Sequence, residues 1–255
     1  MNKKVILITT IIVLCLLLAV SVSSGLFEDQ IQQYPTTISA FSNTGDFMID
    51  PETILESLDH GETNVFMPAI ATPEVYSPPD RHLIYSWSQS DYWKIANALH
   101  QHIWKEALED WKLYRMFFYT DCADELNGFA IGDFVVFKAV IDQWKVRYAA
   151  HEIVIHPLVN SVSWGGNGNF PRPLLGWKSI DLGRLKVRAD DALRIAEENG
   201  GRTVRWGVGN ECRIDILLRS DVDNGWSVDY SNNSGLPIFE MHIDPYTGEY
   251  KILDE

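Results

Sequence analysis

The chain has 255 residues, with 35 acidic against 21 basic side chains and a formal net charge of −14 at pH 7. An acidic surface of this kind repels phosphate groups, so the charge argues against nucleic acid and anionic lipid surfaces as partners. Hydrophobic residues make up 46% of the chain and aromatic residues 12%. This composition can bury a core, and it excludes an acidic disordered tail.

The first 25 residues have the features of a targeting segment. Lys3 and Lys4 precede the run 5–22, which carries no charge. A run of this length lies at the boundary between a signal peptide and a membrane-spanning helix. Segment 1–25 is therefore predicted to be either a signal peptide or a membrane anchor. Both alternatives place the rest of the chain outside the cytoplasm.

Residues 26–83 are predicted to form an arm with one short helix. Prolines recur along this stretch, and they interrupt regular structure. Asp50 followed by Pro51 is a helix start signal, and Gly61 can end that helix. The arm therefore links the targeting segment to the folded part of the chain.

A first folded unit is predicted over residues 84–172. Ser90 can cap a helix that runs to about Asp110. Three strand-like runs follow, at 113–120, 129–140 and 144–155. The stretch 157–173 contains Gly165-Gly166-Asn167-Gly168 and is predicted to be a loop or linker.

A second folded unit is predicted over residues 181–255. Its helix begins near Leu185 and ends around Gly200, since glycine can adopt the left-handed conformation of a helix C-cap. Apolar and polar residues then alternate, which gives each strand one buried and one exposed face. The alternating runs are 212–219, 226–230 and 239–243, with a short run at 250–253. The predicted fold class is therefore α+β, with a helix packed on an antiparallel sheet in one such unit or in two.

The helix of the second unit carries an apolar stripe that should face the sheet. Ala192 and Ala196 are four residues apart and Leu193 is three before Ala196, so the three share one side of the helix. The small alanines let the helix approach a sheet face that carries large side chains. The predicted core of this unit is Ala192, Leu193, Ala196, Ile214, Ile216, Trp226, Val228, Phe239 and Met241.

Three separated pieces of residues 185–253 resemble the PepSY domain. They are the stretch 187–192 with the short helix after it, the W-x-V strand at 226–228 and the closing turn at 243–249, in the family's order. Arg188 stands where the family usually has Ser or Thr as the helix N-cap. The resemblance implies a cystatin-like helix-on-sheet module of the peptidase-propeptide and YPEB type. It also implies an inhibitory, chaperone-like or binding role without catalytic residues.

Cys122 and Cys212 are the two cysteines that follow the N-terminal run, which itself contains Cys15. In an oxidising compartment these two can form a disulfide. The alternative is two separate buried thiols, and the sequence leaves both open. Neither cysteine lies in a nucleophile motif.

No motif in the sequence indicates catalysis, a cofactor or a metal. His151 and His156 resemble a zincin motif, but they are five residues apart and that motif needs four. The stretch 221–225 resembles a calcium loop, lacks its later carboxylate and is predicted to be a tight hairpin. Aspartate and glutamate are abundant, yet their spacing pairs none as acid and base. We therefore predict no catalytic, cofactor-binding or metal-binding residue.

The favoured hypothesis is a non-catalytic binding or regulatory module outside the cytoplasm, which modulates a peptidase or binds a peptide at a sheet edge or groove. The alternative is a structural or small-ligand-binding envelope protein with an aromatic-lined pocket in the first unit. A hydrolase with an unrecognised site is a third class. The expected partners are a protein or peptide of the cell envelope and, through segment 1–25, the membrane. The aromatic residues that could line the pocket of the first unit are Trp87, Trp93, Trp104, Trp111 and Trp144.

Overall fold

A computed structural model describes the greater part of the chain that follows residue 25. The described residues are 42–51, 53–62, 65–68, 87–123, 125–126, 128–142, 145–170, 178–220 and 225–253. The predicted targeting segment and most of the predicted arm lie outside them. Within these described ranges, no helix is both long and apolar enough to cross a membrane.

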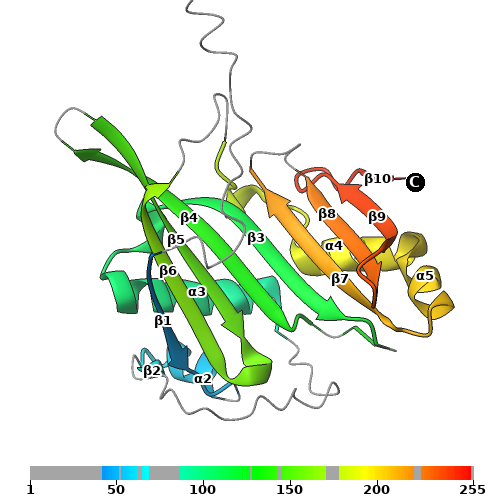
Figure 1. Ribbon diagram of the computed structural model, residues 1–255, viewed down its shortest axis with the longest axis horizontal. Helices are drawn as coiled ribbons and strands as arrows, with labels where there is room; N and C mark the ends of the chain where they lie inside the picture. Colours follow the sequence, from blue (N-terminus) through cyan, green and yellow to red (C-terminus); the bar gives the residue numbers. More distant parts are fainter. Residues whose placement is uncertain are drawn as a thin grey trace, which may run out of the picture. The chain divides into compact units, whose positions relative to one another are not determined.

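Ten strands pair into one antiparallel sheet, in the order β10-β9-β8-β7-β3-β4-β5-β6-β1-β2 (Figure 1). Strands that follow each other in the chain are mostly neighbours in the sheet. The exceptions are the pairs β3–β7 and β1–β6, which join distant parts of the sequence. The strands are β1 (Ser42–Met48), β2 (Met67–Pro68), β3 (Lys112–Asp121), β4 (Ile131–Asp142), β5 (Lys145–His156), β6 (Ser161–Phe170), β7 (Cys212–Arg219), β8 (Trp226–Asn232), β9 (Pro237–Ile243) and β10 (Tyr250–Ile252).

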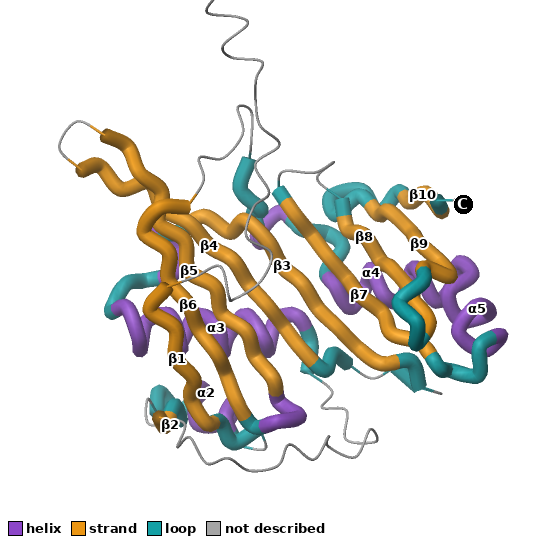
Figure 2. The backbone as a smooth tube through the Cα atoms, viewed as in Figure 1, coloured by secondary structure: helices purple, strands orange, loops and turns teal. Residues whose placement is uncertain are grey.

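The main helices lie on one face of this sheet, as Figure 2 shows with helices in purple behind strands in orange. Helix α3 (Gln89–Trp104) contacts β4 and β5, and α4 (Ala189–Ala196) contacts β7 and β8. Helix α2 (Ile54–Asp59) packs beside α3. Helix α5 (Arg202–Gly207) follows α4 after a break within Glu197–Gly201, where Asn199 and Gly200 leave the helical conformation. Among the described residues no helix covers the opposite face, which we call the open face.

The alternating sequence pattern produces the two faces of the sheet. In β7, Ile214, Ile216 and Leu218 are buried, whereas Arg213 is exposed and Asp215 is half-buried. The buried residues face α4, because apolar area removed from water stabilises the folded state. Of the nine predicted core residues the structure buries eight, and Phe239 is partly buried against the same cluster.

Helix α3 begins at Ser88, two residues before the predicted cap Ser90. The Ser88 hydroxyl accepts a hydrogen bond from the Asp91 N–H at 3.4 Å, and the Asp91 carboxylate accepts one from the Ser88 N–H at 2.8 Å. This reciprocal pair is a capping box, which fixes the helix start. The helix ends at Trp104, short of the predicted Asp110, because Lys105 adopts a left-handed conformation with φ of 57°.

A close approach between α3 and β4 depends on Gly132. The ring of Tyr92, which is fully buried, lies on this glycine, and an added Cβ would be 2.4 Å from the ring. The Tyr92 hydroxyl donates to the Phe129 carbonyl at 2.5 Å. Glycine therefore lets the helix lie directly on the strand that carries part of the site.

The fold class predicted from the sequence is wrong. We expected an α+β arrangement of the cystatin/PepSY type, in which a helix packs on an antiparallel sheet once or twice along the chain. The structure is mostly one antiparallel sheet with only short helices. The physical reason is the pairing of β3 with β7, which runs from Arg115↔Arg219 to Asp121↔Arg213 and makes one sheet of both halves.

The prediction of a loop or linker over residues 157–173 is also wrong for most of that stretch, because β6 occupies Ser161–Phe170. This strand pairs with both β5 and β1. Gly165 lies opposite Glu152 and Gly166 lies opposite His151. Glycines inside a strand often mark a crowded place, and here they leave side-chain space beside two buried residues.

Candidate functional site

One flank of α3 forms the wall of a pocket. Trp93, Asn97 and Gln101 are spaced four residues apart, so they line up along one side of the helix, and all three line the pocket. The Trp93 ring packs edge-on against Phe134, with ring centroids 5.3 Å apart. Within the described ranges, the side-chain amides of Asn97 and Gln101 make no hydrogen bond. Both amides can therefore bond to a ligand.

The facing wall consists of residues 107–113 and 179–183. The 3₁₀ turn Leu108–Asp110 leads into β3, where Leu113 bridges to Ile180 through a 3.0 Å bond from the Ile180 N–H to the Leu113 carbonyl. The two walls enclose a volume of about 730 Å³. Small-molecule sites typically have about 300–1,000 Å³, so the pocket has the size of a ligand site.

The aromatic floor of the pocket is held in place by a stack of rings. Trp111, which lines the pocket, stacks on His151 with centroids 4.0 Å apart. His151 stacks in turn on Trp104 at 3.7 Å, with an angle of 9° between the rings. The indole N–H of Trp111 donates to Glu106 Oε2 at 3.0 Å. Trp111 is thus fixed by both stacking and hydrogen bonding.

A chain of hydrogen bonds sets the protonation of the two buried histidines. His100 Nδ1 lies 3.1 Å from the Glu106 carbonyl oxygen, and His100 Nε2 lies 2.9 Å from His151 Nδ1. A carbonyl only accepts, so a neutral His100 donates from Nδ1 and accepts at Nε2 from the Nδ1–H of His151. Burial lowers the pKa of His151 to about 3 and also lowers the pKa of His100. Both rings are therefore neutral at pH 7, and the floor carries no charge from them.

Charged groups near the pocket lie at its rim. Glu109, Lys112 and Asp181 line the pocket and are exposed. The hydrogen bond from Lys138 lowers the pKa of Glu106, and the Lys138 Nζ lies 5.7 Å from the centroid of the Trp111 ring. The lining of the pocket thus combines indole surface and neutral amides with charged groups that are exposed to solvent.

A buried charge cluster lies on the open face. Arg115 of β3 bonds to Asp133 of β4 at 2.5 Å and to Glu152 of β5 at 2.7 Å. Burial raises the pKa of both carboxyl groups, and the charge of Asp133 raises that of Glu152 further, while Arg115 opposes both shifts. The cluster joins the three central strands and is separate from the pocket residues.

A row of carboxylates crosses the other half of the open face. Asp229 of β8 lies directly opposite Asp215 of β7 and opposite Glu240 of β9. Burial raises the pKa of Asp229 to about 6, and Glu240 and Asp215 add to the shift, while the bond from the Ser227 hydroxyl opposes it. Like charges opposite each other destabilise a sheet, so this row weakens the pairing of β7, β8 and β9 at neutral pH.

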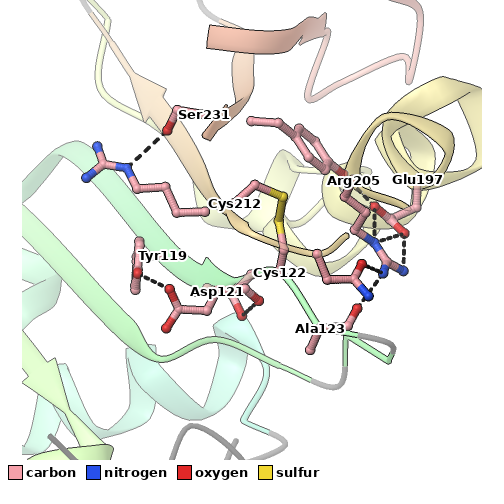
Figure 3. Close-up of a disulfide and its surroundings, with 12 residues drawn as sticks. Tyr119, Asp121, Cys122, Ala123, Glu197, Arg205, Cys212 and Ser231 are labelled. Carbon is pink, nitrogen blue, oxygen red and sulfur yellow. Dashed lines mark hydrogen bonds and ion pairs between the residues drawn. A yellow bond between two sulfur atoms is a disulfide. The ribbon is translucent and has the colours of Figure 1, made fainter. Parts of the chain in front are cut away.

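The prediction of a disulfide is confirmed. Cys122 and Cys212 form a bond with their Cα atoms 5.2 Å apart, at the place where β3 ends and β7 begins. Figure 3 shows the buried ion pair beside it, in which Arg205 Nη2 lies 2.9 Å from Glu197 Oε2. Arg205 also donates to the carbonyl of Ala123, the residue after Cys122. The disulfide and the ion pair therefore hold the same corner of the sheet.

The other residues singled out in the sequence fall in different places. His151 is buried on the helix side of β5, and His156, at the end of the same strand, is half-buried. In the described part of the chain no three His, Cys, Asp or Glu residues are grouped so that they could hold a metal ion. Most of the calcium-like stretch, residues 221–224, lies outside the described residues.

Little in the sequence indicates the groups that the structure brings together. His100 belongs to no motif, yet it is fully buried. Nothing in the spacing of Arg115, Asp133 and Glu152 indicates a cluster. One usable signal was the glycine pair in β6, since missing side chains in a strand mark the position of large or buried neighbours.

No family model, no curated protein and no solved structure matches this chain. The resemblance of residues 185–253 to the PepSY domain therefore stays a prediction. The function has to be argued from the geometry of the pocket and the sheet.

Proposed function

We propose that the chain is a non-catalytic binding protein that takes a small, uncharged, polar ligand in the pocket between α3, β3 and residues 179–183. One observation carries this proposal. The pocket of about 730 Å³ combines two indole rings, of Trp93 and Trp111, with two amides that have no hydrogen-bond partner among the described residues. Pockets of this kind bury a ligand on apolar walls and orient it by a few polar groups.

The chemistry of the lining favours a sugar-like ligand. A pyranose ring has a face of C–H groups that packs on indole, and it has hydroxyl groups around its edge that bond to amides. Asn97 and Gln101 each offer a donor and an acceptor, which suits hydroxyl groups that both donate and accept. The neutral histidines under the floor attract neither an anion nor a cation.

The disulfide supports a location outside the cytoplasm, because disulfides form and persist in oxidising compartments. The charge-free run 5–22 after Lys3 and Lys4 supports the same location. An envelope protein in that position meets the saccharides of the cell surface.

Replacing Trp93 with alanine should weaken binding of a soluble oligosaccharide at least about tenfold, because the ligand loses an indole surface. Gln101→Leu should also weaken binding, since it removes an amide from an exposed position without loss of core packing. The measurement is isothermal titration calorimetry of the full-length chain against panels of neutral and N-acetylated oligosaccharides.

Trp206→Ala is the matched control, because Trp206 is 58% exposed on α5 and does not line this pocket. Its affinity should equal that of the unchanged chain. If a saccharide binds Trp93→Ala and the unchanged chain with equal affinity, its binding site lies outside this pocket. If no oligosaccharide in the panels binds, a sugar-like ligand is excluded.

A second candidate function is the addition of an extended peptide to the sheet at β10. In the described sheet this strand has β9 as its single neighbour, and Tyr250 and Ile252 are 49% and 39% exposed. The Leu253 N–H points inward to the Glu240 carbonyl. Because orientation alternates along a strand, the N–H groups of Tyr250 and Ile252 point outward and can pair with a peptide.

Ile252→Pro should abolish binding of any peptide that uses this edge, because proline has no N–H to donate. Ile252→Ala removes a similar amount of side chain and keeps the donor, so it should retain most of the affinity. The measurement is fluorescence anisotropy with a library of labelled extended peptides. Equal binding by the proline and alanine variants would rule out pairing at this edge.

A further inference from the structure

The buried charge cluster on the open face has an unusual geometry. Arg115 lies level with Glu152, since both are register neighbours of Val135. A single guanidinium nitrogen, Nη2, lies 2.5 Å from Asp133 Oδ2 and 2.7 Å from Glu152 Oε1. Because both oxygens contact one nitrogen, the two carboxyl groups must lie side by side.

The three side chains are almost completely withdrawn from water. Glu152 is 0% exposed, Arg115 is 6% exposed and Asp133 is 8% exposed. The second oxygens of the two carboxyl groups, Asp133 Oδ1 and Glu152 Oε2, have no hydrogen-bond partner among the described residues. A buried acceptor without a partner costs about 1–3 kcal/mol, and more when the group is charged. Two ionised carboxylates against one guanidinium would therefore be a costly arrangement.

The neighbouring strands contribute few groups that could offset the second charge. Gly165 of β6 lies opposite Glu152, and Phe117 and Val154 lie on either side of Asp133. Burial raises the pKa of Asp133 and of Glu152, Asp133 raises that of Glu152 further, and Arg115 lowers both. Among the described residues of these and adjacent strands, other titratable or charged side chains near the cluster include Arg219, Tyr114, Tyr119, Tyr148, His156 and Asp46.

We propose that this cluster is a proton-binding site, in which Asp133 and Glu152 hold one proton between them in the folded protein and release it as the pH rises. The bound proton leaves one negative charge to balance Arg115. It also removes a second negative charge from a place where two carboxyl oxygens have no hydrogen-bond partner among the described residues. The three strands that the cluster joins are β3, β4 and β5, at the centre of the sheet.

The direction of the pH effect follows from linkage. Burial raises the pKa of both carboxyl groups above the value of a free side chain, which is about 4. The folded protein then binds the proton more tightly than the unfolded chain. Stability from this site is fully present at low pH, and it is lost as the pH rises through the folded-state pKa. The site makes the sheet sensitive to alkaline shifts in the compartment where the chain resides.

Urea unfolding of the full-length chain between pH 5 and pH 9 tests the proposal. The unfolding equilibrium constant of the unchanged chain should rise about tenfold per pH unit while one proton is released. Glu152→Gln places a neutral amide where the protonated acid lies, so this contribution disappears. The ratio of the two unfolding constants, unchanged chain over variant, should therefore be at least about tenfold larger at pH 8 than at pH 5. Other titrating groups, such as Asp229, contribute equally to both proteins and cancel in the ratio.

Glu211→Gln is the matched control, because Glu211 is exposed and lies just before β7. The ratio of the unfolding constant of the unchanged chain to that of Glu211→Gln should stay constant with pH. A constant ratio for Glu152→Gln as well would overturn the proposal.

Carboxyl ¹³C NMR on the folded chain gives an answer even where Glu152→Gln does not fold. With aspartate and glutamate labelled in an Asp229→Asn background, a carboxyl signal still titrating above pH 6 is expected. The proposal fails where every labelled carboxyl group has finished titrating below pH 5.

Discussion

Replacing both Cys122 and Cys212 with serine is expected to lower the free energy of unfolding by about 4–5 kcal/mol. The two cysteines are 90 residues apart, and closing so long a loop removes many conformations from the unfolded chain. The loss should appear as a lower midpoint in urea or thermal unfolding of the double variant. The folded sheet should keep its strand content, because β3 and β7 remain hydrogen-bonded along their length.

Cys15→Ser is the matched control, because it makes the same substitution in the N-terminal run and leaves Cys122 and Cys212 in place. The midpoint of unfolding of this variant should equal that of the unchanged chain. A double variant whose midpoint also equals that of the unchanged chain would show that the unfolded chain gains little freedom when the bond is removed.

The disulfide should be coupled to the ion pair beside it. The Cys122 N–H donates to the Cys212 carbonyl at 2.9 Å, and the next residue, Ala123, accepts a bond from Arg205. Both links hold the ends of β3 and β7 near the turn after α4. Mutations in contact are rarely additive, so the effects of losing the disulfide and of losing Arg205 should not simply sum.

Local features of this fold could be predicted from the sequence to a useful degree. The strand-like runs at 113–120 and 129–140 correspond to β3 and β4, because stretches rich in β-branched and aromatic residues favour strands. The pairing of Cys122 with Cys212 was one of two alternatives that the sequence left open, and the structure selects it.

The arrangement of the strands could not be predicted in the same way. The pairing of β3 with β7 is a contact between distant parts of the chain, and no local pattern specifies it. Strand β6 was predicted to be a loop, because its glycines are residues typical of turns and linkers. The prediction of the fold class failed for this reason, although most of the individual strands were predicted.

The candidate sites depend on cross-strand register and so escaped prediction. The alternation within its own strand predicts that Asp229 faces solvent. The register with β7 and β9 shows in addition that it lies between Asp215 and Glu240. Arg115, Asp133 and Glu152 come from three strands and meet only once those strands are aligned. Trp93, Asn97 and Gln101 share a helix side that can be read from their spacing, but their facing wall at residues 179–183 could not be.

Replacing Arg205 with methionine is expected to destabilise the chain by about 3–5 kcal/mol, because it removes the nearer of two guanidinium groups from the buried carboxylate of Glu197 and leaves Arg202, whose Nε lies 3.6 Å away. Arg205 is 2% exposed and Glu197 is 8% exposed. The Arg205 Nε lies 3.1 and 3.0 Å from the two Glu197 oxygens, and the Tyr230 hydroxyl donates to the same carboxylate at 2.8 Å. After the substitution, the Tyr230 hydroxyl and the more exposed Arg202 would remain beside this carboxylate. Urea unfolding at pH 7 measures the loss.

The double variant Glu197→Met/Arg205→Met should recover much of this stability, since a buried ion pair replaced by apolar side chains is often close to neutral. Arg194→Met is the matched control. Arg194 is exposed on α4 and pairs with Asp191 at 3.4 Å and Glu198 at 3.2 Å, so its loss should cost less than about 1 kcal/mol.

The size of the Arg205 effect also reports on the break between α4 and α5. In a straight helix, residues eight positions apart are separated by about 12 Å along the axis, too far for this bidentate contact. Arg205 reaches Glu197 because the helix is interrupted at Asn199 and at Gly200, where φ is 127°. The ion pair therefore stabilises the bend that places α5 next to the disulfide. Should Arg205→Met unfold at the same urea concentration as Arg194→Met, the bend must be held by Gly200 and by the packing of Tyr230, and the ion pair would add little to it.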